Sequence, residues 1–232
     1  MKQIIILLIS LISTTCFAGG RIEQLHRGRG CVLDVGRKGF SNNTIALDTS
    51  VEGNDGTVSG GCVWSNGVAA YYFDGVDGFV DLGILSSIDQ PFSISLWVSF
   101  NDYDGYAIAG EERILVSGPN TIIMDTDDGI RLYCGVSLVA NTGELTDNQW
   151  YYFVFIANGA SSKIYLDGVE IASGNSGNND LNATESSWLA ITGPPYNQRP
   201  FNGKIGNIMI YDHSLSVTEI WQLYQERKYK HR

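Results

Sequence analysis

Proline and basic side chains are scarce in this chain of 232 residues, which has 5 prolines and 15 lysines and arginines. Because 25 aspartates and glutamates oppose them, the formal net charge is −10 at pH 7. Such an acidic surface repels phosphate groups, so we exclude nucleic acid as a partner. The same surface is compatible with cations and with neutral, hydroxyl-rich ligands such as sugars.

Long hydrophobic runs are also few, and the one at residues 4–12 is about half the ~20 residues that a membrane span needs. It follows Lys2 and precedes Cys16-Phe17-Ala18, a small-x-small pattern, so residues 1–18 are predicted to be a secretory signal peptide. A lipoprotein acylated at Cys16 is the less favoured alternative. Cleavage removes Lys2, which changes the net charge from −10 to −11. We expect a secreted protein, in the extracellular space, at the cell surface or in a periplasm, with no transmembrane segment after cleavage.

Cysteines are few as well, and Cys31, Cys62 and Cys134 remain after cleavage. Export permits a disulfide, and three thiols leave one unpaired. We predict a Cys31–Cys62 disulfide because both residues lie in the N-terminal segment, although sequence alone does not establish the pairing. Cys134 lies in the apolar stretch "IRLYCGV" and is expected to be a small buried side chain.

The chain lacks the residue patterns of the common hydrolases. Retaining glycosidases place two carboxyl groups about 5 Å apart. Here Glu111 and Glu112 are adjacent, so on a strand they would point to opposite faces. The three histidines, His26, His213 and His231, accompany no nucleophile elbow. We therefore predict that the protein is not an enzyme.

Strand patterns recur along the chain instead. In "FSISLWVSF", residues 92–100, apolar residues alternate with Ser93, Ser95, Trp97 and Ser99, and we expect this second face to be the more solvated one. "KIYLDGVEIA" reads as a hairpin with an Asp-Gly turn. Ten or more such short strands predict an all-β fold, a two-sheet antiparallel sandwich.

The clearest helix signal lies near the C-terminus. Ser216 and Glu219 have the spacing of a capping box, and the helix that they begin has an apolar face formed by Ile220, Leu223 and Tyr224. We therefore predict one short C-terminal helix.

Two Asp-Gly pairs stand close together in "YYFDGVDGFVDLG", residues 71–83. Asp74 and Asp77 could be oxygen ligands of a cation or could only turn the chain. Because each precedes glycine within a strand-like segment, we favour the turn interpretation.

Three ordered segments resemble a known family. "YYFDGVDGFVDLG" with "FSISLWVSF", "DNQWYYFVFIANGASSKIYLDGVEIASG" and "FNGKIGNIMIYDHSLSVTEIWQLY" are similar to motifs of the concanavalin A-like lectin/glucanase superfamily, in its LamG/pentraxin-like jelly-roll domains. The resemblance implies a jelly-roll β-sandwich over residues 31–225, after a leader at 19–30 and before a basic tail at 226–232. It also implies that Trp150 and Trp221 are buried aromatic residues.

Members of this family bind sugars, proteins or lipid head groups, often with calcium. We therefore predict a secreted, lectin-like recognition module that binds a glycan through loops at the rim of the sandwich. A structural or adhesive domain that binds a cell-surface protein is the alternative, and a polysaccharide-cleaving enzyme is the least favoured.

Candidate ligand-binding residues lie in two loops. The loop "TGPPYNQRPFNG", residues 192–203, is stiffened by prolines, which lowers the entropy lost on binding. It offers an aromatic face and planar hydrogen-bonding groups, at Tyr196, Asn197, Gln198 and Arg199. Tyr103 and Tyr106 would complete the surface if the two loops share a rim.

Calcium is the candidate cofactor, because calcium takes six to eight oxygen ligands, which carboxylate-rich loops supply. Two acidic clusters qualify. One contains Asp102 and Asp104, and the other contains Asp125, Asp127 and Asp128. The alternative for both is an ordinary exposed acidic turn.

Overall fold

Two antiparallel β-sheets and one helix make up most of the computed structural model, which describes residues 30–36, 41–85, 88–101, 113–117, 121–126, 129–143, 145–181, 186–190 and 201–228. The first sheet has the strand order β14-β13-β12-β7-β16-β5-β4, with β1 also paired to β16. Its strands are β1 (Cys31–Val35), β4 (Val63–Ser65), β5 (Ala70–Asp74), β7 (Phe92–Phe100), β12 (Tyr151–Ala157), β13 (Ser162–Leu166), β14 (Val169–Gly174) and β16 (Asn202–Tyr211).

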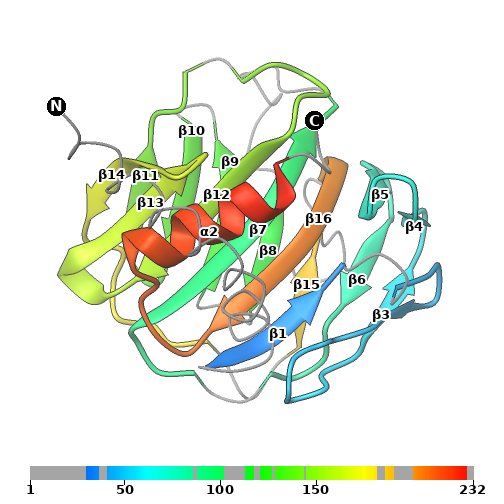
Figure 1. Cartoon of the computed structure of the whole chain (residues 1–232), viewed down its shortest axis with the longest axis horizontal. Helices are drawn as coiled ribbons and strands as arrows, with labels where there is room; N and C mark the ends of the chain where they lie inside the picture. Colours follow the sequence, from blue (N-terminus) through cyan, green and yellow to red (C-terminus); the bar gives the residue numbers. More distant parts are fainter. Residues whose placement is uncertain are drawn as a thin grey trace, which may run out of the picture.

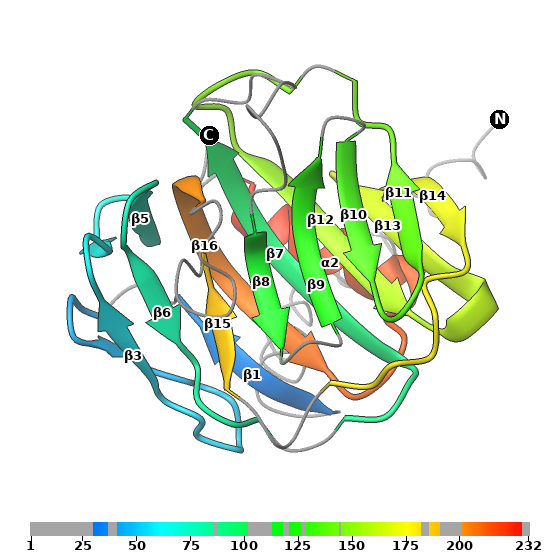
Figure 2. The same cartoon turned by 180° about the vertical axis from the view of Figure 1, so that it is seen from behind.

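The second sheet has the order β11-β10-β9-β8-β15-β6-β3-β2. Its strands are β2 (Ile45–Ala46), β3 (Gly56–Ser59), β6 (Phe79–Asp81), β8 (Arg113–Ser117), β9 (Thr121–Thr126), β10 (Gly129–Tyr133), β11 (Ser137–Ala140) and β15 (Ser187–Leu189). Figures 1 and 2 show the sheets stacked face to face, with the helix α2 (Val217–Arg227) crossing the outer side of the first sheet. The predicted all-β sandwich with a short C-terminal helix is confirmed.

The core between the sheets depends on the alternation in β7. The side chains of Phe92, Leu96 and Phe100 are fully buried in the large hydrophobic cluster that fills the sandwich. Burying side chains of this size contributes about 1.5–3 kcal/mol each. The neighbouring strands β12 and β16 pair with β7 along most of its length, so β7 is the central strand of its sheet.

The other face of β7 differs from the prediction, because its serines are buried rather than solvated. Helix α2 lies against this face, and the Trp97 ring stacks on Tyr224 with centroids 5.8 Å apart. Ser93 Oγ donates a hydrogen bond to His213 O (2.7 Å) and accepts one from Leu215 N (2.9 Å). Small serine side chains therefore leave room for the helix, and Ser93 also holds the segment that leads into it.

Helix α2 begins at the predicted capping box. Ser216 Oγ accepts a hydrogen bond from Glu219 N (3.3 Å), and Ser216 N donates one to Glu219 Oε2 (2.8 Å). The predicted apolar face of Ile220, Leu223 and Tyr224 is formed, and it joins a second hydrophobic cluster with Trp97 and Tyr152.

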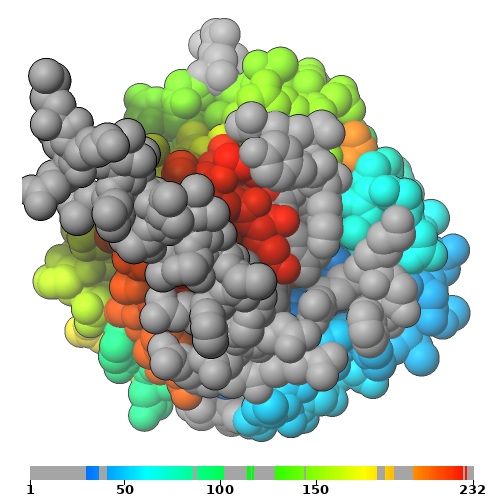
Figure 3. All heavy atoms as spheres, in the orientation of Figure 1, coloured from blue at the N-terminus to red at the C-terminus, as the bar shows by residue number. Residues whose placement is uncertain are grey.

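Trp150 and Trp221 differ in their burial. Trp150 packs against this second cluster, whereas Trp221 is 50% exposed, so its predicted burial is wrong. Trp221 lies beside the turn at Gly168, where an added side-chain carbon would be 2.9 Å from its Cε3 atom. Figure 3 shows part of α2 at the molecular surface.

The hairpin from β13 to β14 is formed as predicted, with Leu166 opposite Val169. Asp167 and Gly168 both adopt positive φ, of 50° and 86°, as the turn requires. Asp167 Oδ1 also accepts a hydrogen bond from Tyr152 N (2.9 Å), which ties the turn to β12.

No disulfide is found among the described cysteines, so the structure does not contain the predicted Cys31–Cys62 bond. The two thiols belong to different hydrophobic clusters, Cys31 with the helix and Cys62 inside the sandwich. Burial raises the pKa of the Cys31 thiol and raises that of Cys62 to about 12, which keeps both protonated at neutral pH. Cys134 is fully buried in the main core, as predicted.

The capping box predicts a measurable loss of stability. In the Ser216→Ala variant, Glu219 N loses its acceptor, and we expect the free energy of unfolding to fall by about 1 kcal/mol. For a domain of this size that lowers Tm by about 2–4 °C. Urea denaturation followed by tryptophan fluorescence checks this. Ser216→Thr keeps the acceptor and should retain most of the stability, and equal losses in both variants would contradict the capping role.

Candidate functional site

Most residues predicted to bind ligand or metal lie outside the described residues. These are Asp102, Tyr103, Asp104, Tyr106, Asp127, Asp128, Tyr196, Asn197, Gln198 and Arg199. The backbone of Asp125 is described, and it lies in β9 opposite Ile130. Among the residues that the structure describes, no three His, Cys, Asp or Glu side chains form a group able to hold a metal ion.

The ends of two strands are joined where the predicted ligand loops attach. Asn101 follows β7, and Asn202 is the first residue of β16. Asn101 N donates a hydrogen bond to Asn202 O (3.1 Å), and Asn101 Nδ2 donates one to Asn202 Oδ1 (3.0 Å). The described attachment points of the two loops are therefore adjacent, at one end of the first sheet.

Asp74 turns the chain, as favoured from the sequence. Its Oδ1 accepts hydrogen bonds from the backbone N–H groups of Val76 (2.9 Å), Asp77 (3.3 Å) and Gly78 (3.4 Å). Asp77 Oδ1 accepts one from Gly61 N (2.8 Å), which connects this turn to the one before β4. Both carboxylates thus act as local acceptors for backbone donors.

A cavity of about 500 Å³ lies at the opposite end of β7 from Asn101, beside the first residues of this strand. Four segments line it: β1, the loop before β3, the loop between β6 and β7, and the residue after β16. The described lining residues are Val32, Glu52, Asn54, Leu85, Ile88, Asp89, Gln90, Pro91 and Asp212. This volume lies within the range of about 300–1,000 Å³ that is typical of small-molecule sites.

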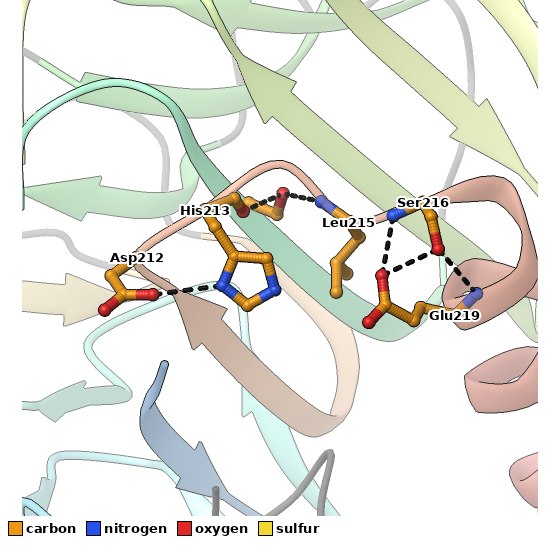
Figure 4. A network of polar contacts seen from close by, with 6 residues as sticks. Asp212, His213, Leu215, Ser216 and Glu219 are labelled. Atoms are coloured by element: carbon orange, nitrogen blue, oxygen red, sulfur yellow. Dashed lines mark hydrogen bonds and ion pairs between the residues drawn. The ribbon is translucent and has the colours of Figure 1, made fainter. Parts of the chain in front are cut away.

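Antiparallel pairing of β1 with β16 forms one wall of the cavity. Cys31 lies opposite Tyr211, and Asp212 N donates a hydrogen bond to Gly30 O (2.9 Å). The Asp212 carboxylate stays exposed and contacts His213 Nδ1 at 3.0 Å (Figure 4). Figure 4 also shows how the chain continues from this wall into the capping box of α2.

A buried aspartate holds the loop that supplies Asn54. The carboxylate of Asp48 accepts hydrogen bonds from the N–H groups of Asp34, Ser50 and Asn54, each at 2.8 Å. Asn54 Nδ2 also donates to Val32 O (3.3 Å). These hydrogen bonds fix the loop to β1 without the help of any ligand.

Gln90 fixes the third wall through its side-chain amide. Its Nε2 donates to Gly177 O (3.1 Å) and Asn179 O (2.9 Å), and its Oε1 accepts from Gly159 N (2.6 Å). Gln90 N donates to Asp180 Oδ1 (2.8 Å). The amide is therefore occupied by the protein, and the neighbouring Asp89 carboxylate remains exposed.

The result is a site with an apolar part and an acidic part. Val32, Leu85, Ile88 and Pro91 supply hydrocarbon surface. Glu52, Asp89 and Asp212 supply carboxylates at exposed positions. Such a combination can hold a ring through its apolar face and accept hydrogen bonds from its donors.

Sequence reasoning missed this site. Its residues come from both ends of the domain and from short stretches such as "IDQPF" that carry no recognised motif. The only local signal was the turn chemistry of "EGNDG", residues 52–56, directly before a strand.

The two stacked antiparallel sheets form a jelly-roll β-sandwich, and comparison with known families agrees. A family model described as the concanavalin A-like lectin/glucanases superfamily matches residues 74–221, which is more than half of the chain. The protein belongs to this superfamily, so the resemblance drawn from its sequence motifs is confirmed. A search of curated protein sequences finds no match.

Solved structures with the same fold include domain 4 of AbnA, a GH43 extracellular arabinanase from Geobacillus stearothermophilus, in complex with arabinotriose. It has 21% identity and a TM-score of 0.66, with 84% of this chain and 98% of that one covered. The binding domain of botulinum neurotoxin serotype D has 15% identity and a TM-score of 0.68, with 86% and 52% covered.

Trypanosoma rangeli sialidase has 15% identity and a TM-score of 0.67, with 95% of this chain and 39% of that one covered. At these identities the three likenesses concern the fold alone. The chain spans about half of the toxin domain and less than half of the sialidase.

The Asp74 turn predicts a specific pH dependence. Hydrogen bonds to its carboxylate, above all from Val76 N, lower the pKa of Asp74 below its usual value. The stabilisation is thus complete above the unfolded pKa of ~3.9 and is lost as the pH falls through the lower, folded pKa.

An NMR titration of the Asp74 carboxyl carbon should give a midpoint below ~3.9. The unfolded chain in urea serves as the reference. A midpoint equal to the reference value would contradict the role of these hydrogen bonds, and Asp74→Asn should remove the corresponding part of the acid-induced loss of stability.

Proposed function

We propose that this protein is a secreted, non-catalytic recognition module that binds carbohydrate in the cavity between β1, β7 and the end of β16. The observation that carries the proposal is the lining of the cavity, in which apolar side chains stand beside exposed carboxylates. Sugar rings present both an apolar face of C–H groups and a rim of hydroxyl donors, so they match such a lining.

The fixed walls of the cavity support a role in binding. Asp48 and Gln90 fix two of its walls through hydrogen bonds that involve no ligand. A preformed site loses less entropy on binding than one that must be ordered. Carbohydrate-binding neighbours with the same fold, such as the arabinanase domain crystallised with arabinotriose, are consistent with this role.

The Asp89 carboxylate gives the sharpest test of carbohydrate binding. Its side chain is exposed and makes no hydrogen bond within the described part of the chain, so Asp89→Ala should leave the fold intact. Hydrogen bonds to a charged group contribute about 1.5–3 kcal/mol, and we expect the affinity for a glycan selected on an array to fall about tenfold or more. Isothermal titration calorimetry measures this loss.

Asp147→Ala is the matched control. It removes the same charge at an exposed position, next to Asn148, whose N–H donates to Phe100 O (2.7 Å) at the far end of β7. That strand is about 27 Å long. Equal losses in both variants, or no binding to any glycan, would contradict the proposal. Reducing-sugar release that Asp212→Asn abolishes would instead indicate an enzyme.

We also propose calcium as a cofactor, held by the carboxylates of Asp102 and Asp104 or of Asp125, Asp127 and Asp128. Their density in two short segments supports it, because close carboxylates repel one another unless a cation screens them. A bound ion should raise the thermal midpoint, by the equivalent of about 2.7 kcal/mol at one hundred times its Kd. Thermal unfolding in EDTA and in millimolar calcium checks this, and an unchanged midpoint would contradict it.

A protein-binding domain is the second candidate, favoured by an exposed apolar patch of Val169, Val217 and Trp221, which are 63%, 61% and 50% exposed. The helix and the hairpin turn adjoin there, since a side-chain carbon at Gly168 would lie 2.9 Å from Trp221 Cε3. A stable oligomer in light scattering that Trp221→Ala dissociates would favour this candidate, if no glycan binds.

A further inference from the structure

In the cavity that we propose as the carbohydrate site, the charged groups among the described lining residues are all carboxylates. Three of its described lining residues are carboxylates, Glu52, Asp89 and Asp212, and none of the described ones is basic. The site is the cavity itself, with a volume of about 500 Å³ and an apolar part. Its carboxylates bear on which ligands can bind there.

The amide groups in the lining do not balance this charge. Both the nitrogen and the oxygen of the Gln90 side chain are used by the loop around residues 159–179. The Asn54 amide nitrogen donates to Val32 O. Side-chain groups left for a ligand are therefore mainly acceptors, so the ligand must bring the donors.

Three lysines elsewhere in the described part of the chain are directed to other partners. Lys163 pairs with Glu170 (2.8 Å), Lys204 lies over the Tyr72 ring, and Lys228 lies over the Tyr224 ring. Among the described residues around the cavity, His213 contacts a lining carboxylate, that of Asp212. No described basic side chain pairs with Asp89 or Glu52, and both are exposed.

Resting on the proposed function, we infer that this cavity selects sugars that carry a protonated amine over neutral N-acetylated sugars and rejects sugars that carry a carboxylate. An ammonium group supplies both the donors and the positive charge that the lining lacks. An ammonium group that is hydrogen-bonded to one of these carboxylates lies well within the ~8 Å screening length at physiological ionic strength, so salt screens their attraction little. The net charge of the protein adds attraction at longer range.

The test compares two oligosaccharides that differ only at the amine, the glucosamine tetramer and the N-acetylglucosamine tetramer, with a galacturonic acid tetramer as the anionic probe. Calorimetry at pH 6 and physiological salt should show the glucosamine tetramer binding about tenfold or more tighter than its acetylated form. We expect no measurable binding of the anionic tetramer.

Charge-neutral, isosteric variants assign the selectivity to the cavity. Combining Glu52→Gln with Asp89→Asn should bring the affinity ratio of the two tetramers close to one, because the affinity for the glucosamine tetramer falls further than that for the acetylated form. Asp147→Asn, at the far end of β7, should leave the ratio unchanged. An equal fall of the ratio in the control would show that only the overall charge matters, and this would overturn the inference.

The remaining outcomes separate the inference from the proposed function. If both neutral and amine-bearing tetramers bind with equal affinity, the inference fails and carbohydrate binding stands. If none of the three tetramers binds and other glycans also fail on an array, the proposed function fails as well. Binding of the anionic tetramer that exceeds that of the glucosamine tetramer also overturns the inference.

Discussion

Burial of β7 on both of its faces is the constraint on which the rest of the structure depends. Phe92, Leu96 and Phe100 pack between the sheets, and Trp97 packs under α2. A strand covered on both sides must be flanked by neighbours that complete its hydrogen bonds, and β12 and β16 do so. The first sheet therefore places β7 at an interior position, with its apolar side chains in the core and its buried serines under α2.

The site follows from that arrangement. Because β16 runs antiparallel to β7, the end of β16 and the start of β7 meet at the same edge of the sheet, where Ser93 pairs with Tyr211. The pairing of β1 with β16 then brings the N-terminal part of the domain to this edge. Carboxylates are tolerated there because they remain exposed, while the apolar side chains beside them continue the core. The cavity is thus a consequence of how three strands end.

Much of the fold could be predicted from the sequence, because the relevant signals are local. The alternation in residues 92–100, the Asp167-Gly168 turn and the capping box at Ser216 each depend on neighbours a few residues away. The burial of Ser93 could not be predicted, since it depends on a helix more than a hundred residues later. The cavity likewise requires contacts between Asp212 and residues near the start of the domain, which no local pattern encodes.

The most direct test is to map ligand contacts along the backbone. Backbone amide chemical shifts, recorded while an oligosaccharide that binds is titrated into the protein, would identify which end of the first sheet contacts the sugar. We expect the largest changes at Val32, Asn54 and Asp89 and their neighbours, around the cavity. Changes centred on Asn101 and Asn202, where the other two loops attach, would contradict the assignment of the binding site to this cavity.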